Sequence, residues 1–189
     1  MRGTREKLEV VAFILSFFIM INLNNPFTFV LFLCSTIYFG YKTYKLIRRV
    51  IKEEREDKFK QLLNIITKEY RSDRILRDER EFETELSSFL KAKFPKYQIT
   101  PQYRTTAGDK IDIVVDNLYA LELKVAYSRK DLDDCFSKIH FYKKHFDKLA
   151  IVVLDIGMLS NLNYYEKEFN KMNVEMIIKK GRVSLRNGR

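Results

Sequence analysis

The sequence predicts an α/β domain with a mixed β-sheet, preceded by a two-helix transmembrane hairpin and a charged helical connector. Three observations lead to this prediction. Only one charged residue, Glu9, lies between Lys7 and Lys42, although 32% of the 189 residues are charged. Residues 42–72 contain no Gly or Pro and are rich in strong helix formers. From residue 78 onward, helix-like and strand-like segments alternate.

The composition limits the class of protein. The chain carries 35 Lys and Arg against 25 Asp and Glu, and residues 1–50 alone contain seven basic and two acidic residues. Both parts of the chain are therefore basic. With 46% hydrophobic residues and only six Gly and three Pro, the chain is expected to fold. Two cysteines, Cys34 and Cys135, exclude a disulfide framework and a cysteine-rich zinc site.

Two apolar runs form the predicted hairpin, with transmembrane helices at about residues 8–23 and 26–46. Residues 26–41 carry no charge, and Asn and Pro residues between the two runs favour a tight turn. An apolar run of sixteen residues spans about 24 Å as a helix, against about 30 Å of hydrocarbon in a bilayer. Interfacial Tyr and long basic side chains would make up the difference.

The flanking charges predict the orientation of the hairpin. Basic residues precede the first run and follow the second, whereas the turn between the runs is uncharged. By the positive-inside rule, we expect a two-pass membrane protein with both termini and the α/β domain in the cytoplasm. A signal peptide is disfavoured because a second apolar run follows and no A-x-A-like cleavage site does. Two buried helices of a soluble core are disfavoured because neither run has a polar face.

The connector, residues 50–78, is expected to be helical and solvated. Its basic residues come first and mixed charges follow, which suits a segment that leaves an anionic lipid surface. Whether it pairs with a second copy to give a homodimer is left open, because the apolar spacing between Ile51 and Leu62 is too irregular for sustained heptads.

Residues 79–189 form the predicted α/β domain. A hairpin turn at Asn117 and Leu118 separates two strands, and the strand, helix and strand between residues 119 and 155 form a crossover of the length that a parallel pair needs. The sheet is therefore expected to be mixed. Helices are expected near 79–93, 129–146 and 159–171, and strands near 97–104, 110–116, 119–125, 148–155, 174–179 and 182–186.

Three charged residues interrupt the most apolar strands of this domain. Asp112 lies within Ile111-Asp112-Ile113, and Glu122 and Lys124 alternate with leucines on the next strand. Because alternate side chains share a face, Glu122 and Lys124 are expected on one side, within reach of Asp112. Buried charges are costly unless they are paired or bind a metal. Two carboxylates and an ammonium group favour a Mg²⁺ site, with Lys124 near a metal-bound water.

A third carboxylate is expected from the first helix of the domain. Its apolar stripe includes Phe82, Leu86 and Phe89, and helical spacing predicts that Glu85 lies on the same buried face. By the same argument Glu83 is expected to be solvated, as are Glu79 and Glu81.

These residues resemble the PD-(D/E)XK nuclease superfamily, which includes restriction endonucleases and archaeal Holliday-junction resolvases. The resemblance covers about residues 80–180 and consists of a helical Glu85, the run Gly108-Asp109-Lys110-Ile111-Asp112, and Glu122-Leu123-Lys124 nine residues later. Ile111 stands where the family name has Pro. Lys138 stands where such nucleases often carry a Gln on a later helix.

The resemblance implies a restriction-endonuclease-like fold and metal-dependent nuclease activity. Asp112, Glu122 and Glu85 would form the acidic site that binds Mg²⁺ or Mn²⁺, and Lys124 would assist the attacking water. The expected substrate is nucleic acid, in particular DNA, with RNA left open; exposed Lys and Arg would neutralise its phosphates. Two alternatives remain: an inactive module of the same fold that binds nucleic acid or protein at the membrane, and a salt bridge between Glu122 and Lys124 on a solvated sheet face.

Overall fold

The computed structural model describes residues 26–106, 108–146 and 148–184. The chain divides into two compact units, Met1–Lys58 and Phe59–Arg189. The first predicted transmembrane helix, at residues 8–23, lies outside the described residues.

Within the first unit, the described residues belong to one helix. Helix α2 spans Pro26–Glu69, so the second apolar run and most of the connector form one uninterrupted helix, and the boundary between the two units falls within it. Large apolar side chains, including Phe29, Ile37 and Tyr38, are exposed along this part of α2. Among the described residues, no helix combines the length and the hydropathy needed to cross a membrane.

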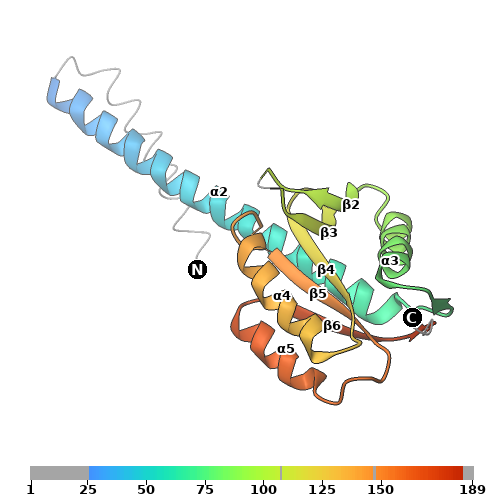
Figure 1. Ribbon diagram of the computed structural model, residues 1–189. Helices are drawn as coiled ribbons and strands as arrows, with labels where there is room; N and C mark the ends of the chain where they lie inside the picture. Colours follow the sequence, from blue (N-terminus) through green and yellow to red (C-terminus); the bar gives the residue numbers. More distant parts are fainter. Residues whose placement is uncertain (1–25, 107, 147, 185–189) are drawn as a thin grey trace. The chain divides into compact units, whose positions relative to one another are not determined.

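The second unit is built on a five-stranded mixed sheet with helices on both faces (Figure 1). The antiparallel part consists of β2, β3 and β4, and the parallel part of β4, β5 and β6. The mixed α/β architecture expected from the sequence is confirmed. In spatial order the strands are β2 (Ile99–Arg104), β3 (Lys110–Val115), β4 (Tyr119–Val125), β5 (Lys148–Asp155) and β6 (Glu175–Lys180).

Asp116 and Asn117 form the turn that joins β3 to β4. Their φ angles are 53° and 54°, and the amide of Leu118 donates to the carbonyl of Val115 at 3.0 Å. Positive φ angles at both central residues and this hydrogen bond are typical of a type I′ turn, in which Asp and Asn tolerate the left-handed conformation. The hairpin expected from the sequence is confirmed: the connection between the strands contains the expected Asn117 and Leu118, preceded by Asp116.

Helices form a layer on each face of the sheet. The end of α2 and α3 (Glu79–Lys93) pack on one face, and α4 (Arg129–Tyr142) and α5 (Leu162–Lys171) pack on the other. A separate parallel pair joins β1 (Ile75–Leu76) to β7 (Arg182–Val183). The last strand expected from the sequence therefore pairs with β1, and it is shorter than expected.

The end of α2 belongs to the core of the second unit. Leu62 and Ile66 are fully buried, and the ring of Phe59 lies 5.5 Å from that of Tyr119. The expected domain start at residue 79 is thus later than the compact unit observed, which begins at Phe59. The physical reason is the helical stripe that Phe59, Leu62 and Ile66 form, continued by Tyr70 just after the helix, because an apolar stripe needs a surface to pack against.

We predict that Ile66→Ala lowers the free energy of unfolding by about 2–5 kcal/mol, because it removes a fully buried side chain. Ile51→Ala on the same helix is the matched control: Ile51 is 44% exposed, and its truncation is expected to change stability by less than about 0.5 kcal/mol. Urea denaturation followed by circular dichroism measures both. Equal losses in the two variants would contradict the assignment of residues 59–70 to the core.

Candidate active site

The candidate site lies where β3 and β4 separate. Their ladder runs from the turn to the pair Ile113–Leu121 and stops there. Asp112 precedes Ile113, the last residue of β3 that pairs with β4. Its side-chain Oδ2 accepts a hydrogen bond from the backbone amide of Leu123 at 2.7 Å, in the place of a backbone carbonyl of β3. The side chain of Asp112 therefore fills the space between the two strands.

Glu122 is the most deeply buried charged residue of the site. Its neighbours Leu121 and Leu123 belong to the core on the α3 side, so Glu122 projects toward the opposite face, which α4 covers. Its exposure is 0%. One oxygen, Oε1, accepts a hydrogen bond from the ammonium group of Lys138 on α4. Among the described residues, the other oxygen, Oε2, has no hydrogen-bond partner.

Burial dominates the electrostatics of Glu122. Loss of hydration, and then the negative charge of Asp112, raise its pKa to about 7, although Lys138 and Lys124 act in the opposite direction. Burial likewise raises the pKa of Asp112, while the hydrogen bond from Leu123 and the charge of Lys138 oppose the rise. Two carboxyl groups thus share a site that disfavours the ionisation of both.

Lys124 is held by Glu79, from the first turn of α3. The ammonium of Lys124 donates to Oε1 and Oε2 of Glu79 at 2.8 and 3.1 Å, and the amide of Val125 donates to Oε2 at 3.2 Å. Burial alone would lower the pKa of Lys124, but the hydrogen bonds and charge of Glu79 raise it. Glu79 was expected to be solvated; its carboxylate is instead part of the site, because α3 begins beside the end of β4.

Glu83 lies one turn after Glu79 and, unlike Glu79, it is buried, with an exposure of 7%. Its Oε2 accepts a hydrogen bond from the side chain of Gln102 at 3.3 Å, and both its burial and the charge of Asp112 raise its pKa. The expectation that Glu83 is solvated is therefore wrong. The buried face of α3 consists of Phe82, Glu83, Leu86, Ser87 and Leu90, a stripe rotated away from the one that the sequence suggested.

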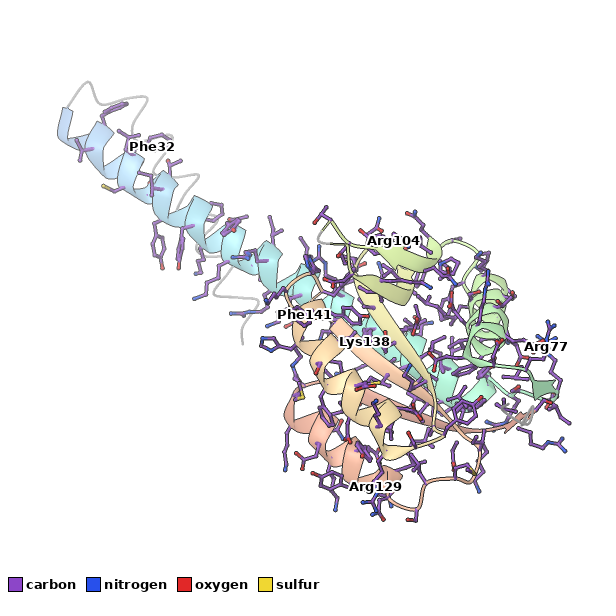
Figure 2. All side chains as sticks on the ribbon, viewed as in Figure 1. Phe32, Arg77, Arg104, Arg129, Lys138 and Phe141 are labelled. Carbon is purple, nitrogen blue, oxygen red and sulfur yellow. The ribbon has the colours of Figure 1, made fainter. Side chains whose placement is uncertain are left out.

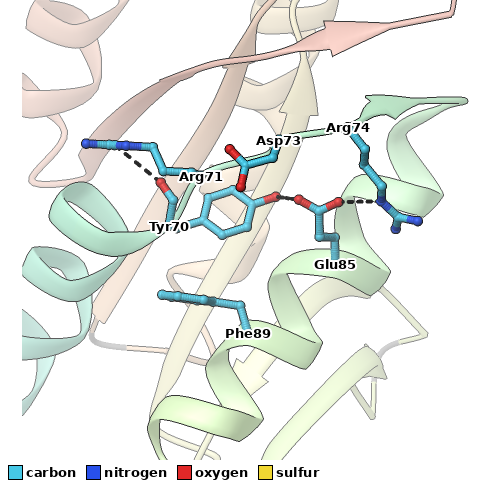
Figure 3. A pocket seen from close by; sticks show the side chains of 6 residues that line it. All are labelled: Tyr70, Arg71, Asp73, Arg74, Glu85 and Phe89. Atoms are coloured by element: carbon cyan, nitrogen blue, oxygen red, sulfur yellow. Dashed lines mark hydrogen bonds and ion pairs between the residues drawn. The ribbon is translucent and has the colours of Figure 1, made fainter.

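Glu85 is directed to a different place (Figure 3). It accepts hydrogen bonds from the hydroxyl of Tyr70 at 2.9 Å and from Nε of Arg74 at 2.8 Å. These three residues line an open pocket of about 390 Å³ together with Arg71, Asp73 and Phe89. The structure therefore unites Asp112, Glu122 and Lys124 as expected, and the helical carboxylates that accompany them are Glu79 and Glu83 instead of Glu85.

Lys138 lies on the exposed edge of the face that α4 turns to the sheet (Figure 2). The buried residues of α4 are Leu132, Cys135, Ile139 and Tyr142, and Ser128 starts the helix with a capping box that includes Asp131. The side chain of Lys138 is 42% exposed, and its ammonium reaches inward to Glu122. Tyr142, one turn later, donates its hydroxyl to the carbonyl of Lys110 at 2.6 Å and so ties α4 to β3.

The site has the donor chemistry for a hard divalent cation. Carboxylate oxygens are the preferred ligands of Mg²⁺, which usually takes one or two carboxylates and keeps several water molecules. Asp112 and Glu122 supply two carboxylates, and the unpartnered Oε2 of Glu122 is the kind of buried polar atom that a cation would satisfy. Within the described ranges, no three His, Cys, Asp or Glu side chains are arranged to hold a metal ion by themselves.

Comparisons with known proteins give no match: no family model fits the chain, and no curated protein or solved structure is similar to it. The resemblance to the PD-(D/E)XK superfamily therefore rests on the residues of this chain alone. Its functional interpretation depends on the geometry described above.

We predict that Glu122→Gln stabilises the protein above pH 7. Because the folded pKa is raised from 4.5 to about 7, the folded state favours the protonated carboxyl group. That contribution to stability is fully present below about pH 4.5 and is lost as the pH rises through 7. A neutral amide at this position does not ionise, so this loss of stability does not occur in Glu122→Gln. At pH 8 its free energy of unfolding should therefore exceed that of wild type by up to about 3 kcal/mol. Urea denaturation of both proteins at pH 5 and pH 8, with a chelator present, measures this difference in the free energy of unfolding.

Glu175→Gln, on the exposed end of β6, is the matched control and should shift stability little at either pH. A Glu122→Gln protein that is less stable than wild type at pH 8 would contradict this prediction. It would mean that the ion pair with Lys138 outweighs the cost of burying the carboxylate.

Proposed function

We propose that the protein is a Mg²⁺-dependent nuclease, also active with Mn²⁺, that hydrolyses phosphodiester bonds in DNA. The observation that carries this proposal is the buried carboxylate of Glu122, with one unpartnered oxygen, beside Asp112 and two lysines. Together with Glu79 and Glu83, the site contains four carboxylates and two ammonium groups. An excess of negative charge in a partly closed site favours a divalent cation.

Each residue has a role in this proposal. Asp112 and Glu122 would hold the metal ion. When bound, Mg²⁺ would supply Lewis-acid stabilisation of the charge that develops on the phosphate. Lys124 would hold the attacking water at the edge of the site, and Glu79 would keep the ammonium group of Lys124 in position. The mixed α/β fold with these residues on adjacent strands is consistent with a restriction-endonuclease-like architecture.

Exposed basic side chains of the second unit support nucleic acid as the substrate. They are exposed, so they are available to neutralise phosphates of a bound strand, and such binding weakens steeply as the salt concentration rises. Figure 2 labels two of them, Arg104 and Arg129. The set consists of Arg104, Lys110, Arg129, Lys130, Lys143 and Lys144.

We predict that the full chain cleaves plasmid or branched DNA when Mg²⁺ or Mn²⁺ is present, and that chelation stops the reaction. Asp112→Asn, Glu122→Gln and Lys124→Met should each lower the cleavage rate about a hundredfold or more, because each removes a ligand of the metal or the group that holds the water. Gel assays under single-turnover conditions measure the rate. Glu175→Gln is the control and should cleave at the wild-type rate.

Glu83 and Glu85 provide an internal comparison. Glu83→Gln should slow cleavage, since Glu83 is buried beside Asp112, whereas Glu85→Gln should act on folding stability through Tyr70 and Arg74. Metal-dependent DNA binding without cleavage would support the alternative, an inactive module of the same fold. Cleavage that persists at the wild-type rate in Asp112→Asn and Lys124→Met would reject the assigned site.

We also propose that the apolar N-terminal part of the chain anchors the protein at a membrane, with both termini and the nuclease-like domain in the cytoplasm. Two observations support membrane association. Exposed apolar side chains, including Leu33 and Ile37, line α2 in the first unit, and basic residues follow them from Lys42 to Lys52. Apolar surface beside a basic collar suits a helix that contacts lipid chains and anionic headgroups.

We predict that the full chain floats with phospholipid vesicles in a density gradient. The double variant Leu33→Lys/Ile37→Lys should lose this association, because lysine is costly in hydrocarbon. Ile75→Lys, at an exposed position of the second unit, is the control and should float like wild type. A wild-type chain that stays in the aqueous fraction would reject the anchor, and a reporter after Arg189 that proves extracytoplasmic would reject the orientation.

A further inference from the structure

The ammonium group of Lys138 donates a hydrogen bond to one carboxylate oxygen of Glu122, Oε1. The two side chains differ sharply in environment: that of Glu122 is fully buried, whereas that of Lys138 is 42% exposed. Lys138 thus reaches from the surface of α4 into the interior to meet Oε1 of a carboxylate whose other oxygen, Oε2, has no hydrogen-bond partner among the described residues. The ammonium group of Lys138 is therefore bound to the same carboxylate that would bind the metal ion in the proposed function.

The second lysine of the site does not compete for this position. Lys124 donates to both oxygens of Glu79, whose Oε2 also accepts from the amide of Val125. Its position is therefore set by α3 and β4. Only the contact of Lys138 has to change when the carboxylate of Glu122 takes another cation.

We propose that Lys138 is a built-in counter-ion that competes with the divalent metal ion for the negative charge of Glu122, and that tight metal binding requires its ammonium group to move away from the carboxylate. This inference rests on the proposed function, because it takes Asp112 and Glu122 as the metal ligands. Lys138 acts through Glu122 and is a positioning residue: it neutralises the site when the metal is absent and sets how tightly the metal binds.

Displacement of Lys138 is physically accessible. A lysine side chain has four rotatable carbon–carbon bonds, and the ammonium group regains hydration when it swings into water. Since the side chain is already half exposed, it can leave without disturbing the buried side chains Leu132, Cys135 and Ile139, through which α4 packs on the sheet. The carboxylate, in contrast, cannot reach water and must retain a cation or take a proton. Exchange of one cation for another is therefore the least costly change at this position.

Competition of this kind predicts whether a substitution of Lys138 raises or lowers the affinity for the metal ion. If the metal binds tightly only after the ammonium group of Lys138 has moved away, the measured affinity is the intrinsic affinity reduced by the small fraction of molecules in which that group is away. Lys138→Met removes the competitor and keeps the length and apolar stem of the side chain. The measured affinity for the metal should therefore rise.

The test is a calorimetric titration of the full chain with Mn²⁺ and with Ca²⁺, at one pH and about 0.15 M salt to screen remote charges. Lys138→Met is expected to bind Mn²⁺ about tenfold or more tightly than wild type. Lys138→Arg keeps the positive charge and should bind much like wild type. Lys167→Met, which removes an exposed lysine from α5, is the matched control for net charge and should change the affinity less than about twofold.

A second measurement guards against a Lys138→Met chain that unfolds when metal-free. A ligand that binds only the folded state stabilises it by a free energy that grows with the logarithm of the ligand concentration divided by Kd, so Mn²⁺ should raise the unfolding temperature more in Lys138→Met than in wild type. The gain should vanish in Lys138→Met/Glu122→Gln, which lacks the carboxylate for which the two cations compete.

Equal affinity in Lys138→Met and Lys167→Met, weaker binding in Lys138→Met, or no metal binding in any variant would overturn the proposal. These outcomes are distinct from failure of the proposed function. Tighter binding by Lys138→Met without cleavage by wild type would support the counter-ion and reject the nuclease. Metal-dependent cleavage by wild type with unchanged affinity in Lys138→Met would support the nuclease and reject the counter-ion.

Discussion

The carboxylate of Glu122, buried between the sheet and α4, is the constraint on which the site depends. A charge without access to water must be paired, protonated or bound to a cation. The interactions around it follow from that requirement: Lys138 reaches inward from α4, Asp112 raises its pKa, and Oε2 lacks a hydrogen-bond partner within the described residues. Replacement by Leu would fit the apolar strand β4 better, so its presence costs stability that packing elsewhere in the unit must offset.

The sheet provides the space for this group by interrupting its own hydrogen bonding. Between β3 and β4 the ladder ends at Ile113 and Leu121, and the side chain of Asp112 takes over the next amide. The site therefore forms without leaving the amide of Leu123 unpaired, which would be costly at this depth. Gln102 on β2 has a φ angle of 52° and turns its amide toward Glu83, so the irregularity extends to the edge strand.

Sequence periodicity predicted the strand residues of the site well and the helical ones poorly. Alternation in a strand has only two outcomes, so apolar neighbours suffice to place Glu122 and Lys124 on one face. A helix can rotate continuously about its axis. The position of Phe89 predicted a buried stripe that includes Glu85. The ring of Phe89 instead packs against the ring of Tyr70, with 5.3 Å between the ring centroids, and the face of α3 toward the sheet carries Glu83. The left-handed backbone of Gln102 depends on tertiary context and has no sequence signal comparable to a glycine.

The cost of the site also bears on whether the domain is a catalyst or an inactive module. A module that only binds a partner through its surface gains nothing from a carboxylate with 0% exposure, and exchange of that group for an amide would stabilise it. Lys138 reduces the cost but does not remove it, because burial and Asp112 still raise the pKa of Glu122 to about 7. Destabilising carboxylates are typical of sites whose ligand is a cation or a proton in transfer. The energetic disadvantage of Glu122 in the metal-free fold is therefore an argument for metal-dependent chemistry that does not depend on resemblance to any family.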